Sequence, residues 1–133
     1  MITDDNKTTL SKIRFEKAEK ALNEAQLTLD AGAYDSSVHK SYYTILHCIR
    51  AVLVLDGFDS KNHGQVIGRF NREYVKSGVF AEDTHKLISR AYRYRERSDY
   101  EDEFEADAEV AQQQLRDAVL FHNQTKEYLK TRY

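Results

Sequence analysis

The chain contains no proline, and its five glycines stand at positions 32, 57, 64, 68 and 78 of 133 residues. The absence of proline excludes proline-kinked helices. Three of the glycines (32, 57 and 78) follow runs with the apolar periodicity of a helix, where glycine commonly ends the helix. The pattern predicts an all-α fold.

The sequence also lacks a second cysteine and long apolar runs. Cys48 is the single cysteine, which excludes an intramolecular disulfide and favours a reducing compartment. No apolar run approaches the ~20 residues of a membrane-spanning helix, and residues 1–5 lack the basic and apolar regions of a signal peptide. We therefore expect a cytoplasmic protein that does not associate with a membrane.

Charge of one sign is not in excess either, because 20 basic and 22 acidic side chains give a formal net charge of −2. This balance provides no general attraction to nucleic acid, so DNA is not expected as a partner and any RNA contact must come from local charge segregation. With 41% hydrophobic and 32% charged residues, the composition is that of a globular protein with a packed core. Its length suits one domain over residues 1–133.

Helical periodicity and helix-ending residues together predict five helices. The expected ranges are 8–30 with Thr8 as N-cap, 35–56, 62–77 with Asn62 at its start, 81–97, and 107–129 with Asp107 as N-cap. The second is apolar over most of its circumference and should be the most buried. Because the connections are short, we expect an up-and-down five-helix bundle.

The fourth predicted helix carries one arginine on an unexpected face. At about 100° per residue, four basic side chains share one stripe, whereas Arg95 lies nearly opposite, on the side of Ile88 and Ala91. The stripe consists of Lys86, Arg90, Arg93 and Arg97. An arginine directed toward the core needs a carboxylate or a phosphate as partner. The stripe itself has two interpretations, a nucleic-acid-binding surface or a solvated face paired with acidic residues.

Arg95 is the first of several residues whose polar side chains could bind a ligand or move a proton. The segment continues through Glu96, Ser98 and Asp99 to Tyr100. In a continuous helix the side chains of Arg95 and Tyr100 would point about 140° apart, so they share a site only if the chain unwinds near Ser98 and Asp99. Such a site could hold a phosphate bidentately on Arg95. The alternative is an internal salt bridge from Arg95 to Asp99 or to a neighbouring helix.

Four polar residues share one side of the second predicted helix: His39, Tyr43, His47 and Arg50. The two histidines are eight residues apart, too far for one metal ion, and no Cys/His cluster supplies further ligands. Glycine-rich phosphate loops are absent as well. We expect neither a metal nor a cofactor, and interpret these residues as hydrogen-bonding groups or as the lining of a cleft that receives Arg95.

Several strings, taken in order from about residue 18 to 121, resemble the HEPN domain family. They are Ser41-Tyr42-Tyr43-Thr44-Ile45-Leu46-His47-Cys48-Ile49-Arg50-Ala51-Val52-Leu53, Gly57, Lys61-Asn62-His63-Gly64, Phe70, Val75-Lys76-Ser77-Gly78 and Arg95-Glu96-Arg97-Ser98-Asp99-Tyr100. The resemblance implies a five-helix bundle that usually dimerises and joins two copies of an Arg-polar-x-x-x-His motif. Arg95 and Glu96 match its start, and Tyr100 stands where the histidine would be.

The resemblance implies two classes of function. The first is a metal-independent endoribonuclease toxin in a toxin–antitoxin system, often encoded beside a small nucleotidyltransferase antitoxin, with Arg95 stabilising phosphorane charge and Tyr100, Asp99 or a histidine of the second helix moving the proton. The second is a non-catalytic partner of a nucleotidyltransferase that binds nucleotide or RNA, in which Tyr100 is the candidate for adenylylation. Tyrosine, with a pKa near ~10, is a poorer base than histidine. A third alternative is a dimeric scaffold without a ligand.

Overall fold

The computed structural model describes residues 3–133, which form five α-helices and no strand. The helices are α1 (Asp4–Asp30), α2 (Tyr34–Leu53), α3 (His63–Phe70), α4 (Thr84–Tyr100) and α5 (Ala108–Lys130). A 3-10 turn, Val54–Asp56, extends α2, and a π-helical turn, Asn71–Val75, extends α3. The predicted all-α bundle is confirmed. Within the described range, no helix is both long enough and apolar enough to cross a bilayer.

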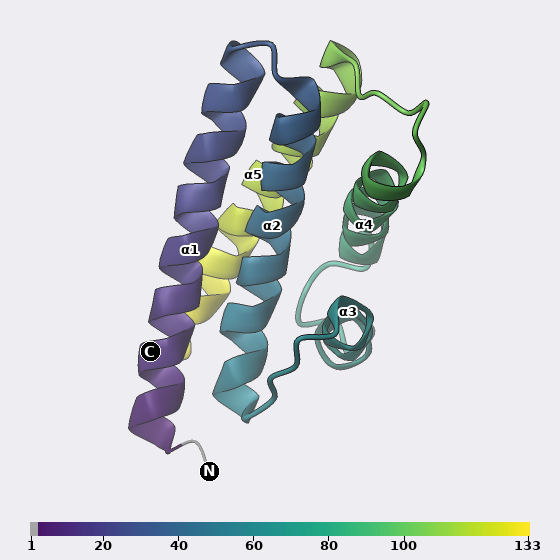
Figure 1. Cartoon of the computed structure of the whole chain (residues 1–133). Coiled ribbons are helices and arrows are strands. Elements are labelled where there is room, and N and C mark those ends of the chain that lie inside the picture. The colour runs from purple at the N-terminus through teal and green to yellow at the C-terminus, as the bar shows by residue number, and fades with distance from the viewer. Residues whose placement is uncertain (1–2) are drawn as a thin grey trace.

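The helix α2 lies at the centre of the molecule (Figure 1). It forms an antiparallel hairpin with α1, and α5 crosses behind the pair, while α3 and α4 lie to one side and are seen nearly end-on. All four other helices contact α2. A helix surrounded in this way must be apolar on most of its surface, which explains the wide apolar face of its sequence.

The core forms where α2 meets aromatic side chains from the other elements. Ile45, Ile49 and Leu53 are almost completely buried and belong to the same cluster as Phe70 and Phe121. Cys48 is fully buried in that cluster, and burial raises the pKa of its thiol to about 12. The thiol is therefore neutral at physiological pH and acts as a small apolar side chain.

Two of the three predicted helix starts that rested on capping residues are confirmed. Asn62 accepts a hydrogen bond from the Gln65 amide at 3.0 Å, and Asp107 accepts one from the Val110 amide at 2.8 Å. Thr8 was the wrong cap, because α1 already begins at Asp4 and Thr3 accepts the capping bond from Asn6. Acidic residues in this first turn favour the earlier start through the helix dipole.

The boundaries of the fourth helix differ from the predicted range of 81–97. The helix begins at Thr84 and continues through Ser98 and Asp99 to Tyr100. Side chains hold the last turn together, since Arg95 pairs with Asp99 and Arg97 pairs with Glu101, each four residues further on. Such i, i+4 pairs offset the low helix propensity of serine and aspartate.

Candidate functional site

Arg95 extends from the last turns of α4 toward α2, where it meets two tyrosines. Its guanidinium carbon lies 5.5 Å from the centre of the Tyr42 ring, and its Nη2 donates a long hydrogen bond of 3.4 Å to the Tyr43 hydroxyl. The Arg95 side chain is 21% exposed, so it is neither fully buried nor freely solvated. This placement agrees with the face predicted from helical spacing.

Asp99 supplies the carboxylate that Arg95 needs. Its Oδ2 lies 3.0 Å from Arg95 Nε, although the N–H direction does not meet hydrogen-bond geometry. Burial lowers the pKa of Arg95, but Tyr43 and Asp99 outweigh that effect and leave the pKa above its ordinary value. The internal salt bridge considered from the sequence is therefore present. Because Nη1 makes no hydrogen bond within residues 3–133, the same guanidinium still has donors for a ligand.

The other oxygen of Asp99 faces a histidine on α2. Asp99 Oδ1 lies 3.4 Å from His39 Nε2, and the same nitrogen lies 3.1 Å from the Ser98 hydroxyl. The carboxylate thus connects α2 with the end of α4. The predicted interpretation of the α2 polar side, as hydrogen-bonding groups that meet Arg95, holds for His39 and Tyr43.

Tyr100 does not join this group within one chain. Because α4 remains helical to its end, the unwinding that would bring Tyr100 to Arg95 does not occur, and the two side chains point about 140° apart. Tyr100 is 74% exposed. The Glu96 carboxylate interacts with Tyr92 and raises the pKa of its hydroxyl. Roles for Tyr100 and Glu96 in a shared site stay predictions.

A histidine for which the sequence pattern predicts no role faces the two tyrosines. His63, the first residue of α3, places its Nδ1 3.0 Å from the Tyr42 hydroxyl, and its ring meets the Tyr43 ring edge-on at 6.2 Å between centroids. Arg95 therefore packs against the same two tyrosines as His63. The only signal in the sequence was the string Lys61-Asn62-His63-Gly64, which carried part of the family resemblance.

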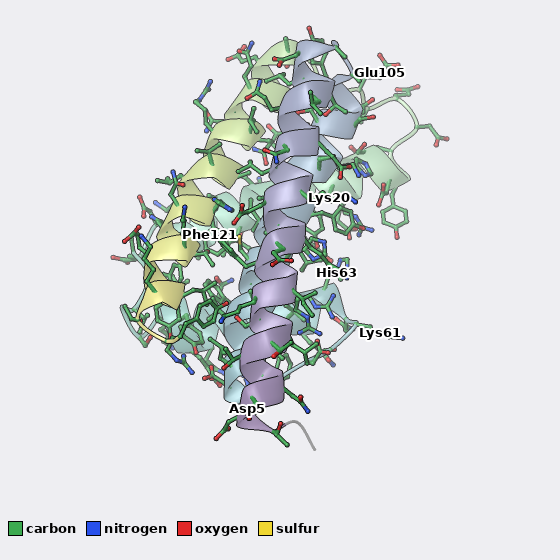
Figure 2. The ribbon with its side chains drawn as sticks, turned by 90° about the vertical axis from the view of Figure 1, so that its left-hand side faces the viewer. Asp5, Lys20, Lys61, His63, Glu105 and Phe121 are labelled. Carbon is green, nitrogen blue, oxygen red and sulfur yellow. The ribbon has the colours of Figure 1, made fainter. Side chains whose placement is uncertain are left out.

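His47 lies one turn beyond Tyr43 on α2, beside a basic region formed by Lys17, Lys20 and Lys40. Burial, followed by the charges of Arg50, Lys17 and Arg14, lowers the pKa of His47 to about 4. His47 and Tyr43 line a pocket of about 240 Å³ between α1 and α2. The other lining residues are Lys17, Lys20, Ala21, Glu24 and Lys40. Figure 2 shows Lys20 and His63 on the same side of α1, so this basic region and the tyrosine pair share one face.

The basic stripe on α4 is not one free surface. Arg90 makes an ion pair of 3.1 Å with Asp117 of α5, a carboxylate that is only 7% exposed. Arg97 pairs with Glu101 at 2.8 Å and covers the Phe104 ring at 4.2 Å. Lys86 and Arg93 are exposed and make no ion pair among residues 3–133. Half of the stripe is thus paired with acidic residues, and a role for its four members in binding RNA stays a prediction.

The described residues 3–133 contain no cluster of three or more histidine, cysteine, aspartate or glutamate side chains that could hold a metal ion. The site is instead built from one arginine, one carboxylate, two phenols and two histidines at the junction of α2, α3 and α4. Such a set can bind an anion through the guanidinium and can exchange protons through imidazole.

This fold and site define a helical bundle with an arginine-centred polar cluster, and comparison with known proteins identifies its family. The model of the HEPN domain matches residues 11–128, so the chain belongs to the HEPN domain family. It is 32% identical over 123 residues to a Methanocaldococcus jannaschii protein named "Putative toxin", covering 92% of this chain and 83% of that protein. It is also 33% identical over 115 residues to a protein of Archaeoglobus fulgidus named "UPF0332 protein", covering 86% and 91% of the two chains.

Proposed function

We propose that this protein is a toxin-like HEPN protein that cleaves RNA without a metal ion, at a site centred on Arg95. The observation that carries the proposal is the placement of Arg95, which is held by Tyr42, Tyr43 and Asp99 while part of its guanidinium has no protein partner. A preorganised arginine of this kind stabilises the charge that develops on a phosphorus centre under attack. The name of the Methanocaldococcus jannaschii relative supports the toxin-like role.

The proposal includes a homodimer in which two copies of the 95–100 segment come together, as the family membership implies. Within one chain, Tyr100 is exposed at the end of α4 and is not engaged by the Arg95 cluster. We also infer that a nucleotidyltransferase antitoxin is the partner that controls the activity, within a toxin–antitoxin system.

The test is cleavage of a mixed RNA pool by the purified protein in EDTA, with its mass in solution measured on the same sample. Arg95→Ala should reduce cleavage at least ~100-fold, the size typical of losing one transition-state charge stabiliser. The matched control is Arg116→Ala, which removes an exposed arginine of α5 that belongs neither to the site nor to the basic stripe. Equal cleavage by both variants, or none by a folded wild-type dimer, would contradict the proposal.

A second candidate function is favoured by the exposure of Tyr100. Its hydroxyl replaces the motif histidine and is accessible to a modifying enzyme, which suits a non-catalytic nucleotide- or RNA-binding partner that a nucleotidyltransferase adenylylates at Tyr100. In that case the wild-type protein, freed of any adenylyl group, would bind nucleotide or RNA through Arg95 without cleaving it. Arg95→Ala would then abolish binding, and Tyr100→Phe would abolish adenylylation only.

A further inference from the structure

A proton acceptor is the component that the Arg95 site lacks on its own helix. Metal-independent cleavage of RNA requires a group that takes the proton from the attacking 2′-hydroxyl. Asp99 is engaged by Arg95 and His39, and Tyr100 points away from Arg95. The remaining candidates lie on the elements that pack against Tyr42 and Tyr43.

We propose that His63 of α3 is the general base of this site and takes over the role of the histidine that the motif lacks. The proposal rests on the proposed function and assigns one further catalytic residue to it. Its geometric basis is that Arg95 and His63 contact the same two tyrosines, Tyr42 and Tyr43, and that the Arg95 charge acts on the His63 imidazole. A phosphodiester held on the free guanidinium donors would thus lie beside the imidazole.

The Tyr42 hydroxyl positions the imidazole for this task. The Tyr42 hydroxyl oxygen lies 3.0 Å from His63 Nδ1. His63 Nε2 makes no hydrogen bond within residues 3–133, and the side chain is partly exposed. When Nδ1–H donates to the Tyr42 oxygen, Nε2 presents its lone pair to a ligand. The histidine lies at the N-terminus of α3, so its backbone is fixed by the Asn62 cap.

The chemical step is a transesterification within one RNA strand. The 2′-oxygen attacks the adjacent phosphorus while its proton passes to His63 Nε2. The bond from phosphorus to the 5′-oxygen breaks, and that oxygen takes a proton from solvent. The products are a 2′,3′-cyclic phosphate and a 5′-hydroxyl end, and no oxidant, reductant or metal takes part. Arg95 neutralises the charge that builds on the non-bridging oxygens.

The surroundings of His63 keep it in the base form at neutral pH. Burial, followed by the charges of Arg95 and Arg50, lowers the pKa of His63 below its ordinary value of ~6.5. The groups that face it are Tyr42 and Tyr43, with His47 nearby on the same helix. The ratio kcat/KM should therefore rise with pH through an apparent pKa below ~6.5 and then reach a plateau.

The experiment compares three single substitutions in the full-length protein under the EDTA assay. His63→Gln should lower kcat at least ~100-fold and remove the acidic limb of the pH profile, while Arg95-dependent RNA binding persists. Tyr100→Phe should retain cleavage. The matched control is His85→Gln, which alters an exposed histidine near the start of α4.

Three results would overturn the assignment of His63. The first is a kcat of His63→Gln equal to that of the wild type, and the second is an unchanged acidic limb of the pH profile in that variant. The third is loss of cleavage in Tyr100→Phe, which would show that the Tyr100 hydroxyl, and not His63, takes the proton. A wild-type profile with no limb below ~6.5 would also overturn it, even if His63→Gln did not fold. Absence of any wild-type cleavage would instead reject the ribonuclease proposal itself, so the two failures are distinguishable.

Discussion

At the residue scale, Asp99 determines how Arg95 can act. The carboxylate lies on the Nε side of the guanidinium and offsets part of its charge, while Tyr42 and Tyr43 fix the plane and one end of the group. The result is an arginine that is already oriented before a ligand arrives. A preoriented arginine loses less conformational entropy on binding a phosphate than a solvated one.

His47 shows how the same basic environment affects stability. Its pKa in the folded protein, about 4, lies below the ordinary value of ~6.5 in the unfolded chain. Between these values the unfolded state binds more protons, so the free energy of unfolding falls as the pH decreases. Allowing for solvent screening of this half-buried group, we expect His47 to cost about 1 kcal/mol between pH 7 and pH 5.

The measurement is urea unfolding of wild type and His47→Gln at both pH values. The variant should lose less stability on acidification than the wild type by that amount. His85→Gln is the control, because His85 is exposed and should leave the pH dependence unchanged. If His47→Gln lost as much stability as the wild type between pH 7 and pH 5, folding would not lower the pKa of His47, and the prediction would be wrong.

At the element scale, glycine acts differently in a turn and in a helix. Gly57 ends the α2 extension with φ of +82°, a conformation that costs an L-residue about 1–2 kcal/mol. Gly68 lies inside α3 with open space where a Cβ would project. Gly57→Ala should therefore destabilise the protein, whereas Gly68→Ala should stabilise it by about 0.5–1 kcal/mol. Thermal unfolding of the matched pair tests this, and shifts of the same sign would contradict it.

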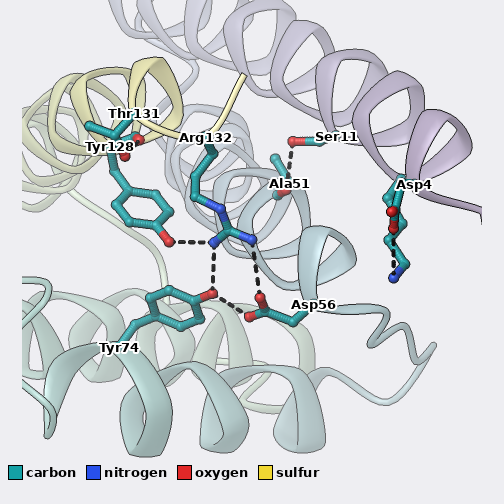
Figure 3. Close-up of polar contacts among 9 residues, drawn as sticks. Asp4, Ser11, Ala51, Asp56, Tyr74, Tyr128, Thr131 and Arg132 are labelled. Atoms are coloured by element: carbon teal, nitrogen blue, oxygen red, sulfur yellow. Dashed lines mark hydrogen bonds and ion pairs between the residues drawn. The ribbon is translucent and has the colours of Figure 1, made fainter.

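At the scale of the whole molecule, the end of the chain connects elements that are distant in sequence (Figure 3). Arg132 donates to the Tyr128 hydroxyl at 2.5 Å and to the Tyr74 hydroxyl at 3.4 Å, and pairs with Asp56 at 3.3 Å. Tyr74 in turn donates to Asp56. These contacts join the end of α5 to the turns that follow α2 and α3.

Arg132→Ala should destabilise the protein by about 1–2 kcal/mol, because it leaves Asp56 without its cationic partner in a partly buried position. The control is Lys130→Ala, which removes an ion pair with Glu127 in which both side chains are mostly exposed. Such a pair contributes about 0–1 kcal/mol. Denaturant midpoints measure both effects, and equal midpoints for the two variants would mean that the Arg132 contacts are not stabilising.

The sequence by itself determined the helical class, the approximate extent of most helices and the face of Arg95. These depend on local rules, namely a periodicity of about 3.6 residues, capping side chains and positive-φ glycines. The end of α4 was misplaced because two local effects compete: Ser98 and Asp99 favour a helix end, whereas the i, i+4 ion pairs Arg95–Asp99 and Arg97–Glu101 carry the helix on to Tyr100.

Only the tertiary structure decided which side chains meet Arg95. His63 is 32 positions away along the chain, and it reaches the same tyrosines because α3 and α4 pack on one side of α2. Arg90 likewise finds Asp117 only through the contact of α4 with α5. Periodicity places a residue on a face of its own helix, but the partner across that face is determined by how the helices pack against one another.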